Sequence, residues 1–179
     1  MLLEAFAGLP DSSDWRLVVA GEPWEGLESQ LVGLIDERGL GDRVRTELRW
    51  IPESEVPGLL AACDLVVLPY RSGSQSAVAP LALSAGLPVL STRVGGLSEV
   101  VQDGMNGVLV EAGSIDELAR AFEEMDDERL GTLAEGARRS RDRLTWDGYA
   151  AALEDLLEDV AGANSEFGTR NSEFPSVRS

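Results

Sequence analysis

Three short runs of apolar residues constrain the fold of this chain more than any other feature of its sequence. They are largely continuous, and they comprise residues 64–70 (DLVVLPY), 88–93 (PVLSTR) and 107–112 (GVLVEA). A strand with one solvated face would alternate apolar and polar residues, whereas a continuous apolar run is typical of a strand buried on both faces. Helical segments separate the runs, so the sequence predicts an α/β protein with a doubly wound, Rossmann-like parallel sheet.

The other segments fit the same alternation of strands and helices. Expected strands cover residues 15–22 and 44–51, and expected helices cover residues 25–38, 52–62, 115–125, 129–143 and 146–160. Ser114 and Glu117 have the spacing of a capping box at the start of one of these helices. The chain opens with MLLEAFAGL, a short amphipathic helix with no strand before it, which indicates a piece cut from a longer protein.

Charge and composition exclude several classes of protein. The formal net charge is −17, with 15 Lys and Arg against 32 Asp and Glu, so binding to nucleic acid or to an anionic membrane is disfavoured. The chain has no His, which excludes Ser-His-Asp triads, Cys-His dyads, His general bases and most zinc sites. No apolar run approaches the roughly 20 residues of a membrane span. The single cysteine, Cys63, lies in an apolar context and indicates a reducing, cytoplasmic compartment.

The last residues differ in composition from the rest of the chain. We expect one domain over residues 1–162, followed by a tail over residues 163–179 that contains the sequence NSEF twice. Glu-Phe is the translation of a common cloning site, so the tail is interpreted as sequence derived from a vector or adaptor. The alternative is a natural disordered tail with a chance repeat.

The order of several motifs resembles a known family. The chain contains LLEAFAGLP, a strand ending in VVAG, LVVLPY, PLALSAGLPVLSTRVGGLSEVVQDGMNGVLV, a helix entered through SIDELARAF, and TW near Thr145. This order resembles the C-terminal half of retaining glycosyltransferases of the two-domain GT-B type, especially family four, over nearly the whole of residues 1–160. The resemblance implies that the chain binds a nucleotide-sugar donor without a metal or other cofactor. It also implies that the N-terminal half, which binds the acceptor, is missing, together with an upstream Arg and Lys that contact the donor phosphates.

The segment from Leu65 to Ser98 contains no acidic residue, although the chain as a whole is strongly acidic. It includes the end of one expected buried strand, a polar loop, and a helix that starts near Ala77. Ligands bind parallel α/β sheets beyond the carboxyl ends of the strands, and a helix start offers free N–H groups to an anion. We therefore expect the donor diphosphate at this loop, and the expected phosphate-binding residues are Arg71, Gly73, Ser74, Gln75, Ser76, Ala77 and Val78. The alternative is a flexible polar loop.

The resemblance is incomplete at the sugar and ribose contacts. The family usually carries two Glu residues across this helix start, and the matching positions are Ser74 and Ala82, or Gly73 and Leu81. Neither alignment supplies a carboxylate, so Gln75 and Ser76 are hypothesised to replace it.

Further positions match the family near the nucleobase and in the next turn. Trp50 and Ile51 match a backbone contact to the base, and the alternative is that Trp50 belongs to the core or covers the surface. Gly95 and Gly96 allow close approach of the backbone to a ligand or a positive φ, and Glu99 either favours the helix dipole or acts on the substrate. The sequence leaves two other functions open: a non-catalytic nucleotide-binding or interaction module, and half of a GT-B-type sugar-nucleotide epimerase.

Overall fold

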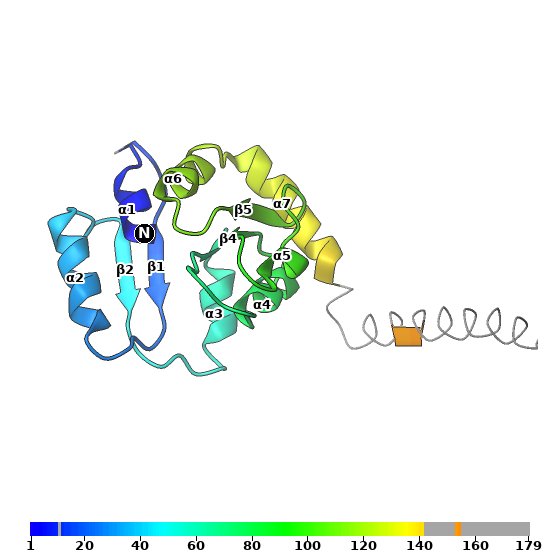
Figure 1. Ribbon diagram of the computed structural model, residues 1–179, viewed down its shortest axis with the longest axis horizontal. Coiled ribbons are helices and arrows are strands. Elements are labelled where there is room, and N and C mark those ends of the chain that lie inside the picture. The colour runs from blue at the N-terminus through cyan, green and yellow to red at the C-terminus, as the bar shows by residue number, and fades with distance from the viewer. Residues whose placement is uncertain (11, 142–152, 155–179) are drawn as a thin grey trace, which may run out of the picture. The chain divides into compact units, whose positions relative to one another are not determined.

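The computed structural model describes residues 1–10, 12–141 and 153–154. Helices and strands alternate along the first 141 residues (Figure 1). The helices are α1 (Leu2–Ala7), α2 (Leu27–Glu37), α3 (Val56–Ala61), α4 (Val78–Ser84), α5 (Leu97–Val100), α6 (Ile115–Glu123) and α7 (Asp127–Arg141). The strands are β1 (Leu17–Ala20), β2 (Val44–Glu47), β3 (Val66–Leu68), β4 (Val89–Thr92) and β5 (Gly107–Val110). The helix expected at residues 146–160 lies outside the described residues, apart from residues 153–154, which are helical, and so does the expected tail.

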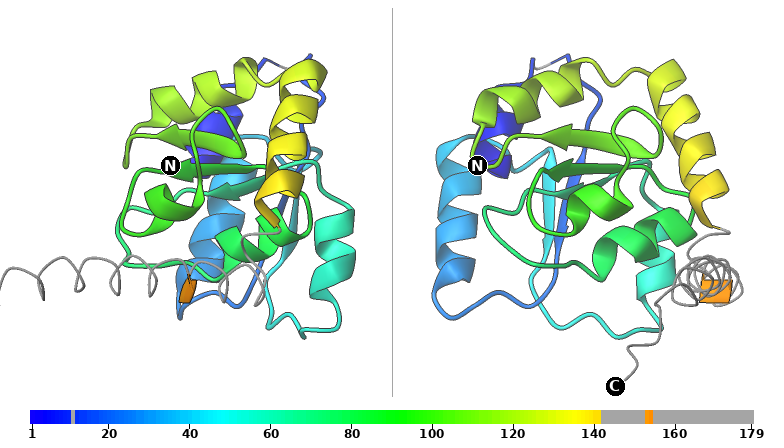
Figure 2. Two further views of the ribbon diagram at one scale, coloured as in Figure 1. Left: turned by 90° about the vertical axis from the view of Figure 1, so that its right-hand side faces the viewer. Right: turned by 45° about the vertical axis from the view of Figure 1, so that its right-hand side comes forward.

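All strand pairs in the described residues are parallel, which confirms the predicted α/β class. The pairing differs from a single continuous sheet, because β1 pairs only with β2, while β3, β4 and β5 form a second sheet in that order. Helices cover both faces of the three-stranded sheet, with α1 and α6 on one face and α4 and α5 on the other (Figure 2). Every residue of β4 and β5 is buried, as their continuous apolar runs predict.

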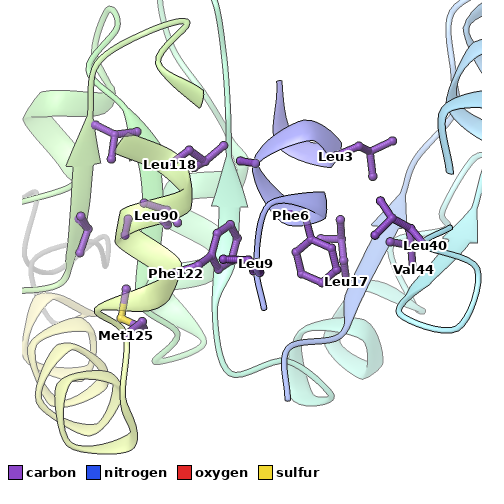
Figure 3. Close-up of a cluster of buried hydrophobic side chains, with 14 of the residues drawn as sticks. Leu3, Phe6, Leu9, Leu17, Leu40, Val44, Leu90, Leu118, Phe122 and Met125 are labelled. Atoms are coloured by element: carbon purple, nitrogen blue, oxygen red, sulfur yellow. The ribbon is translucent and has the colours of Figure 1, made fainter. Parts of the chain in front are cut away.

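The larger of two hydrophobic cores joins both sheets. In this core, the ring of Phe122 from α6 makes edge contacts with Phe6 of α1 and with Trp15, which precedes β1. The ring centroids are 6.0 Å apart for Phe6 and Phe122 and 5.4 Å apart for Trp15 and Phe122. Phe6 and Leu9 lie between Leu17 of β1 and Phe122 of α6 (Figure 3). The second core lies beneath α4 and α5, and alternate residues of β4 reach the two cores. Such burial is the main stabilising term for a parallel sheet.

Side-chain caps fix the segments around β5. Ser114 caps α6 by accepting a hydrogen bond from the Glu117 N–H at 3.2 Å, as predicted. The Glu117 carboxylate accepts from the Glu111 N–H at 2.8 Å, so the second bond of a capping box is replaced by one to the end of β5. Asn106 is 1% exposed, and its side chain bonds to the Gln102 N–H, the Val100 carbonyl and the Ser140 hydroxyl.

The described residues contain neither a candidate metal site nor a candidate membrane span. No group of three or more Asp, Glu, Cys or His side chains in this part of the chain could hold a metal ion. No helix in the same residues is long and apolar enough to cross a membrane.

Candidate functional site

The loop between β3 and α4 is anchored to β4 by side-chain hydrogen bonds. The Thr92 hydroxyl donates to the Tyr70 carbonyl at 2.6 Å, and the Ser91 hydroxyl donates to the Leu68 carbonyl at 3.3 Å. Both residues are almost fully buried, since Thr92 is 1% exposed and Ser91 is 0% exposed. They hold the end of β3 and the start of the loop at the carboxyl edge of the three-stranded sheet.

The loop is also held by the turn that follows β4. The Gly96 N–H donates to the Ser74 carbonyl at 2.7 Å. Gly95 has a φ of +48°, and a Cβ atom placed on it would lie 2.7 Å from the Ser74 oxygen and nearer still to the Gly73 carbonyl. Gly95 was predicted either to let the backbone approach a ligand closely or to adopt a positive φ. In the structure its backbone closely approaches the β3–α4 loop, and its φ is positive. The structure thus brings two predicted sets of site residues together, those of the loop and those of the Gly95–Gly96 turn.

Ser76 has a structural role at the start of α4. Its hydroxyl accepts from the Val78 N–H at 3.2 Å and lies 3.2 Å from the Tyr70 hydroxyl. The Val78 N–H was predicted to face the donor phosphate, but in this structure it is already paired with Ser76. Ser74 and Gln75 are exposed, and the Gln75 Cγ would lie 3.6 Å from a Cβ atom placed on Gly96. The same Cβ atom would lie 3.9 Å from a Glu99 carboxylate oxygen, so Gln75 and Glu99 flank this turn.

Arg71 is exposed and lies near the start of α1. The pKa of the Glu4 carboxyl group is lowered first by a hydrogen bond from the Met1 amino group and by its charge. The positive charge of Arg71 also contributes to lowering this pKa. Arg71 therefore lies within electrostatic range of the start of α1.

Leu81 and Ala82, the two residues of α4 predicted to contact the ribose, lie away from the exposed part of the β3–α4 loop. Ala82 has no exposed surface and belongs to the core beneath α4, so its side chain cannot meet a ligand in this structure. Leu81 lines a cavity together with Asp64 and Pro88, which precede β3 and β4 and thus mark the amino edge of the sheet. Neither Leu81 nor Ala82 therefore presents its side chain at the carboxyl edge, where the ribose contact was predicted.

Two tryptophans are exposed beyond the ends of the two-stranded sheet. Trp50 is 69% exposed, so the interpretation as a core residue is wrong, and its carbonyl accepts a hydrogen bond from Arg49 at 3.2 Å. Arg49 also forms ion pairs with Glu47 and Glu55, which fix the backbone leading to the half-buried Ile51. Trp24, which sequence reasoning missed, is 86% exposed in the loop after β1.

The position of Trp24 in the sequence is the signal that could have marked it as a candidate site residue. It follows a glycine after a predicted parallel strand, and β1 ends beside β2 in the observed register. Loops at the carboxyl ends of parallel strands are where ligands bind, so an aromatic residue there could have been considered together with Trp50.

Comparison with known proteins identifies the family. The model for glycosyl transferases group 1 matches residues 1–127. The chain belongs to this family. Among the relatives of this glycosyltransferase domain, the D-inositol 3-phosphate glycosyltransferase of Salinispora tropica is 35% identical over 171 residues. That match covers 91% of the chain and 34% of the relative, so the domain spans about a third of the relative's length.

Solved structures of the GT-B type share the fold of this glycosyltransferase domain. HepE of Anabaena, in complex with UDP, has a TM-score of 0.75 and 27% identity over 88% of this chain and 44% of that chain. The same protein was also solved with UDP-glucose. The C-terminal domain of the group 1 protein LpcC from Francisella tularensis has a TM-score of 0.69, over 78% of this chain and 74% of that chain. At 23% identity, the LpcC comparison concerns the fold alone.

Proposed function

We propose that this glycosyltransferase domain binds the nucleotide-sugar donor of a retaining transfer reaction, and that a separate N-terminal half binds the acceptor. The observation that carries the proposal is the pairing of the β3–α4 loop with the Gly95–Gly96 turn. This pairing presents backbone and amide groups at the carboxyl edge of a parallel sheet, where such sheets bind ligands. HepE, which shares the fold, binds UDP and UDP-glucose.

The donor diphosphate is proposed to lie against the exposed part of the loop. Arg71 supplies a positive charge, and Ser74 and Gln75 supply side-chain donors that no other described group engages. Hydrogen bonds to an ionised phosphate contribute about 1.5–3 kcal/mol each, more than bonds between neutral groups. The absence of acidic side chains from Leu65 to Ser98 removes the repulsion that the rest of this acidic chain would exert.

The indole rings of Trp24 and Trp50 are proposed to border the nucleobase, because both are exposed beyond neighbouring strand ends.

Residues 1–162 are proposed to form the donor domain, with the tail outside it. A reducing, cytoplasmic compartment is proposed from the free thiol of Cys63. Because the chain spans about a third of the relative's length, it is proposed to transfer little or no sugar by itself.

A heat-stability titration tests the proposal. UDP, GDP and ADP are compared with inorganic phosphate at equal ionic strength, and one of the nucleotides is expected to raise the unfolding temperature in a saturable way. Gln75→Ala is expected to weaken that nucleotide about tenfold or more, since a bond to a charged group is lost. Gln30→Ala, which removes an exposed glutamine from α2, serves as the matched control. Equal and unsaturable effects of all four ligands would favour a non-catalytic interaction module.

A further inference from the structure

The side chain of Arg49 closes the turn that follows β2. Its Nη2 and Nη1 atoms donate to the two carboxylate oxygens of Glu55, at 2.5 and 3.4 Å, so this ion pair is bidentate. Its Nε atom lies 3.5 Å from a carboxylate oxygen of Glu47, and Nη1 also donates to the Trp50 carbonyl at 3.2 Å. Glu47 is the last residue of β2, and Glu55 immediately precedes α3. One side chain therefore joins the end of the strand, the middle of the turn and the start of the next helix.

Glu47 extends this network to the loop after β1, which ends at the same edge as β2 (Figure 1). Its two carboxylate oxygens pair with Arg45, at 2.6 Å, and with Arg49. The hydrogen bond from Arg45, together with the charge of that residue, lowers the pKa of the Glu47 carboxyl group. The Glu47 carbonyl accepts from the Gly21 N–H at 3.1 Å, and Gly21 begins the loop that carries Trp24. The loops after β1 and β2 therefore share Glu47 as an anchor.

The network orients the turn without being needed for folding. The side chains of Arg49 and Glu55 are 49% and 45% exposed. An exposed ion pair contributes only about 0–1 kcal/mol to stability. A bidentate pair between Arg and a carboxylate also fixes the relative orientation of the two groups, because its two bonds are parallel. Loss of Arg49 is therefore expected to change the local geometry of the turn more than the stability of the protein.

The turn carries backbone groups that are available to a ligand. The Trp50 carbonyl is engaged by Arg49, whereas no group within residues 1–10 and 12–141 bonds to the N–H or the carbonyl of Ile51. These two residues were predicted to contact the nucleobase through the backbone. Such hydrogen bonds span about 2.7–3.2 Å and weaken steeply as their geometry changes. A small displacement of the turn would therefore be enough to lose them.

We infer that Arg49 is a positioning residue for nucleobase recognition, and that it acts through Glu47 and Glu55 by fixing the turn. This inference rests on the proposed donor binding. The guanidinium group of Arg49 is bound by two carboxylates and one carbonyl, so its positive charge is already balanced. It therefore differs from Arg71, which is proposed to face the diphosphate. Removing Arg49 should weaken recognition of the base and leave recognition of the phosphates unchanged.

A set of four variants tests this role by calorimetric or NMR titration of the full chain with UDP, GDP, ADP and inorganic pyrophosphate. For the nucleotide that the unchanged chain binds most tightly, Arg49→Gln is expected to weaken binding about fivefold or more, and pyrophosphate affinity is expected to stay within about twofold. Glu55→Gln is expected to act in the same direction. The double variant is expected to bind no more weakly than Arg49→Gln, because both substitutions break the same pair. Arg129→Gln removes an exposed ion pair with Glu124, at 3.0 Å, and is the matched control with unchanged binding.

Three results would overturn the inference and leave donor binding intact. Unchanged nucleotide affinity in Arg49→Gln would mean that the turn keeps its position without this side chain. Equal weakening of the nucleotide and of pyrophosphate would mean that Arg49 acts on the phosphates. Additive losses in the double variant would mean that Arg49 and Glu55 act separately. If the unchanged chain binds none of the three nucleotides, the proposed donor binding is wrong and the role of Arg49 falls with it.

Discussion

Replacing Gly95 with Ala tests the contact that holds the β3–α4 loop to the turn after β4. Two costs follow from the structure. The φ of +48° costs an L-residue about 1–2 kcal/mol. The new methyl group would also overlap the Gly73 carbonyl oxygen and lie 2.7 Å from the Ser74 oxygen, so the loop must retreat and the hydrogen bond from the Gly96 N–H, worth about 1 kcal/mol, is lost. The expected loss in the free energy of unfolding is therefore about 2–3 kcal/mol.

Gly104→Ala separates the two costs. Gly104 has a φ of +73°, and nothing lies within 4 Å of a Cβ atom placed there, so this variant carries only the conformational cost. Urea or thermal unfolding of both variants gives the difference, which we expect to be about 1 kcal/mol, or about 3 °C in unfolding temperature. Equal destabilisation by the two substitutions would refute the argument that the loop is held through Gly95. An unchanged exchange rate of the Gly96 amide in Gly95→Ala would refute it as well.

Three further predictions concern packing, buried polar groups and the cysteine. Gly136→Ala is expected to destabilise the protein by about 3 kcal/mol or more, because the new methyl group would overlap the Met105 carbonyl. Gly131 is exposed on the same helix, so Gly131→Ala is expected to be neutral or stabilising in the same unfolding assay. Asn106→Ala is expected to cost about 2–4 kcal/mol in chemical unfolding, since a buried amide with three hydrogen bonds is removed, and a loss below about 1 kcal/mol would contradict this. Burial raises the pKa of the Cys63 thiol, so alkylation at pH 8 is expected to be slower in the folded chain than in urea, and equal rates would contradict the burial.

The sequence predicted the strands and helices well because their signals are local. Continuous apolar runs identified β3, β4 and β5, and the spacing of Ser114 and Glu117 located the start of α6. The division into two sheets could not be predicted in this way. An apolar run indicates that a strand is buried, but it does not identify the strand that pairs with each edge.

The site was predicted in part for the same reason. The loop from Arg71 to Val78 and the Gly95–Gly96 turn both follow buried strands, and the structure brings them together as the rules for parallel sheets require. Ala82 was misplaced because matching a motif position does not reveal which face of a seven-residue helix is buried. The pairing of Ser76 with the Val78 N–H depends on loop geometry that no sequence pattern indicated.

The most direct test of the central claim is an NMR titration of this chain with UDP, GDP and ADP, each compared with its nucleoside monophosphate. The account predicts that one diphosphate shifts the amide signals of Gly73, Ser74, Gln75 and Gly96 in a saturable way, with weaker binding of the monophosphate. Saturable shifts confined to the amino edge, around Asp64 and Leu81, would contradict the proposed site. The absence of a saturable shift with every nucleotide would contradict donor binding by this domain.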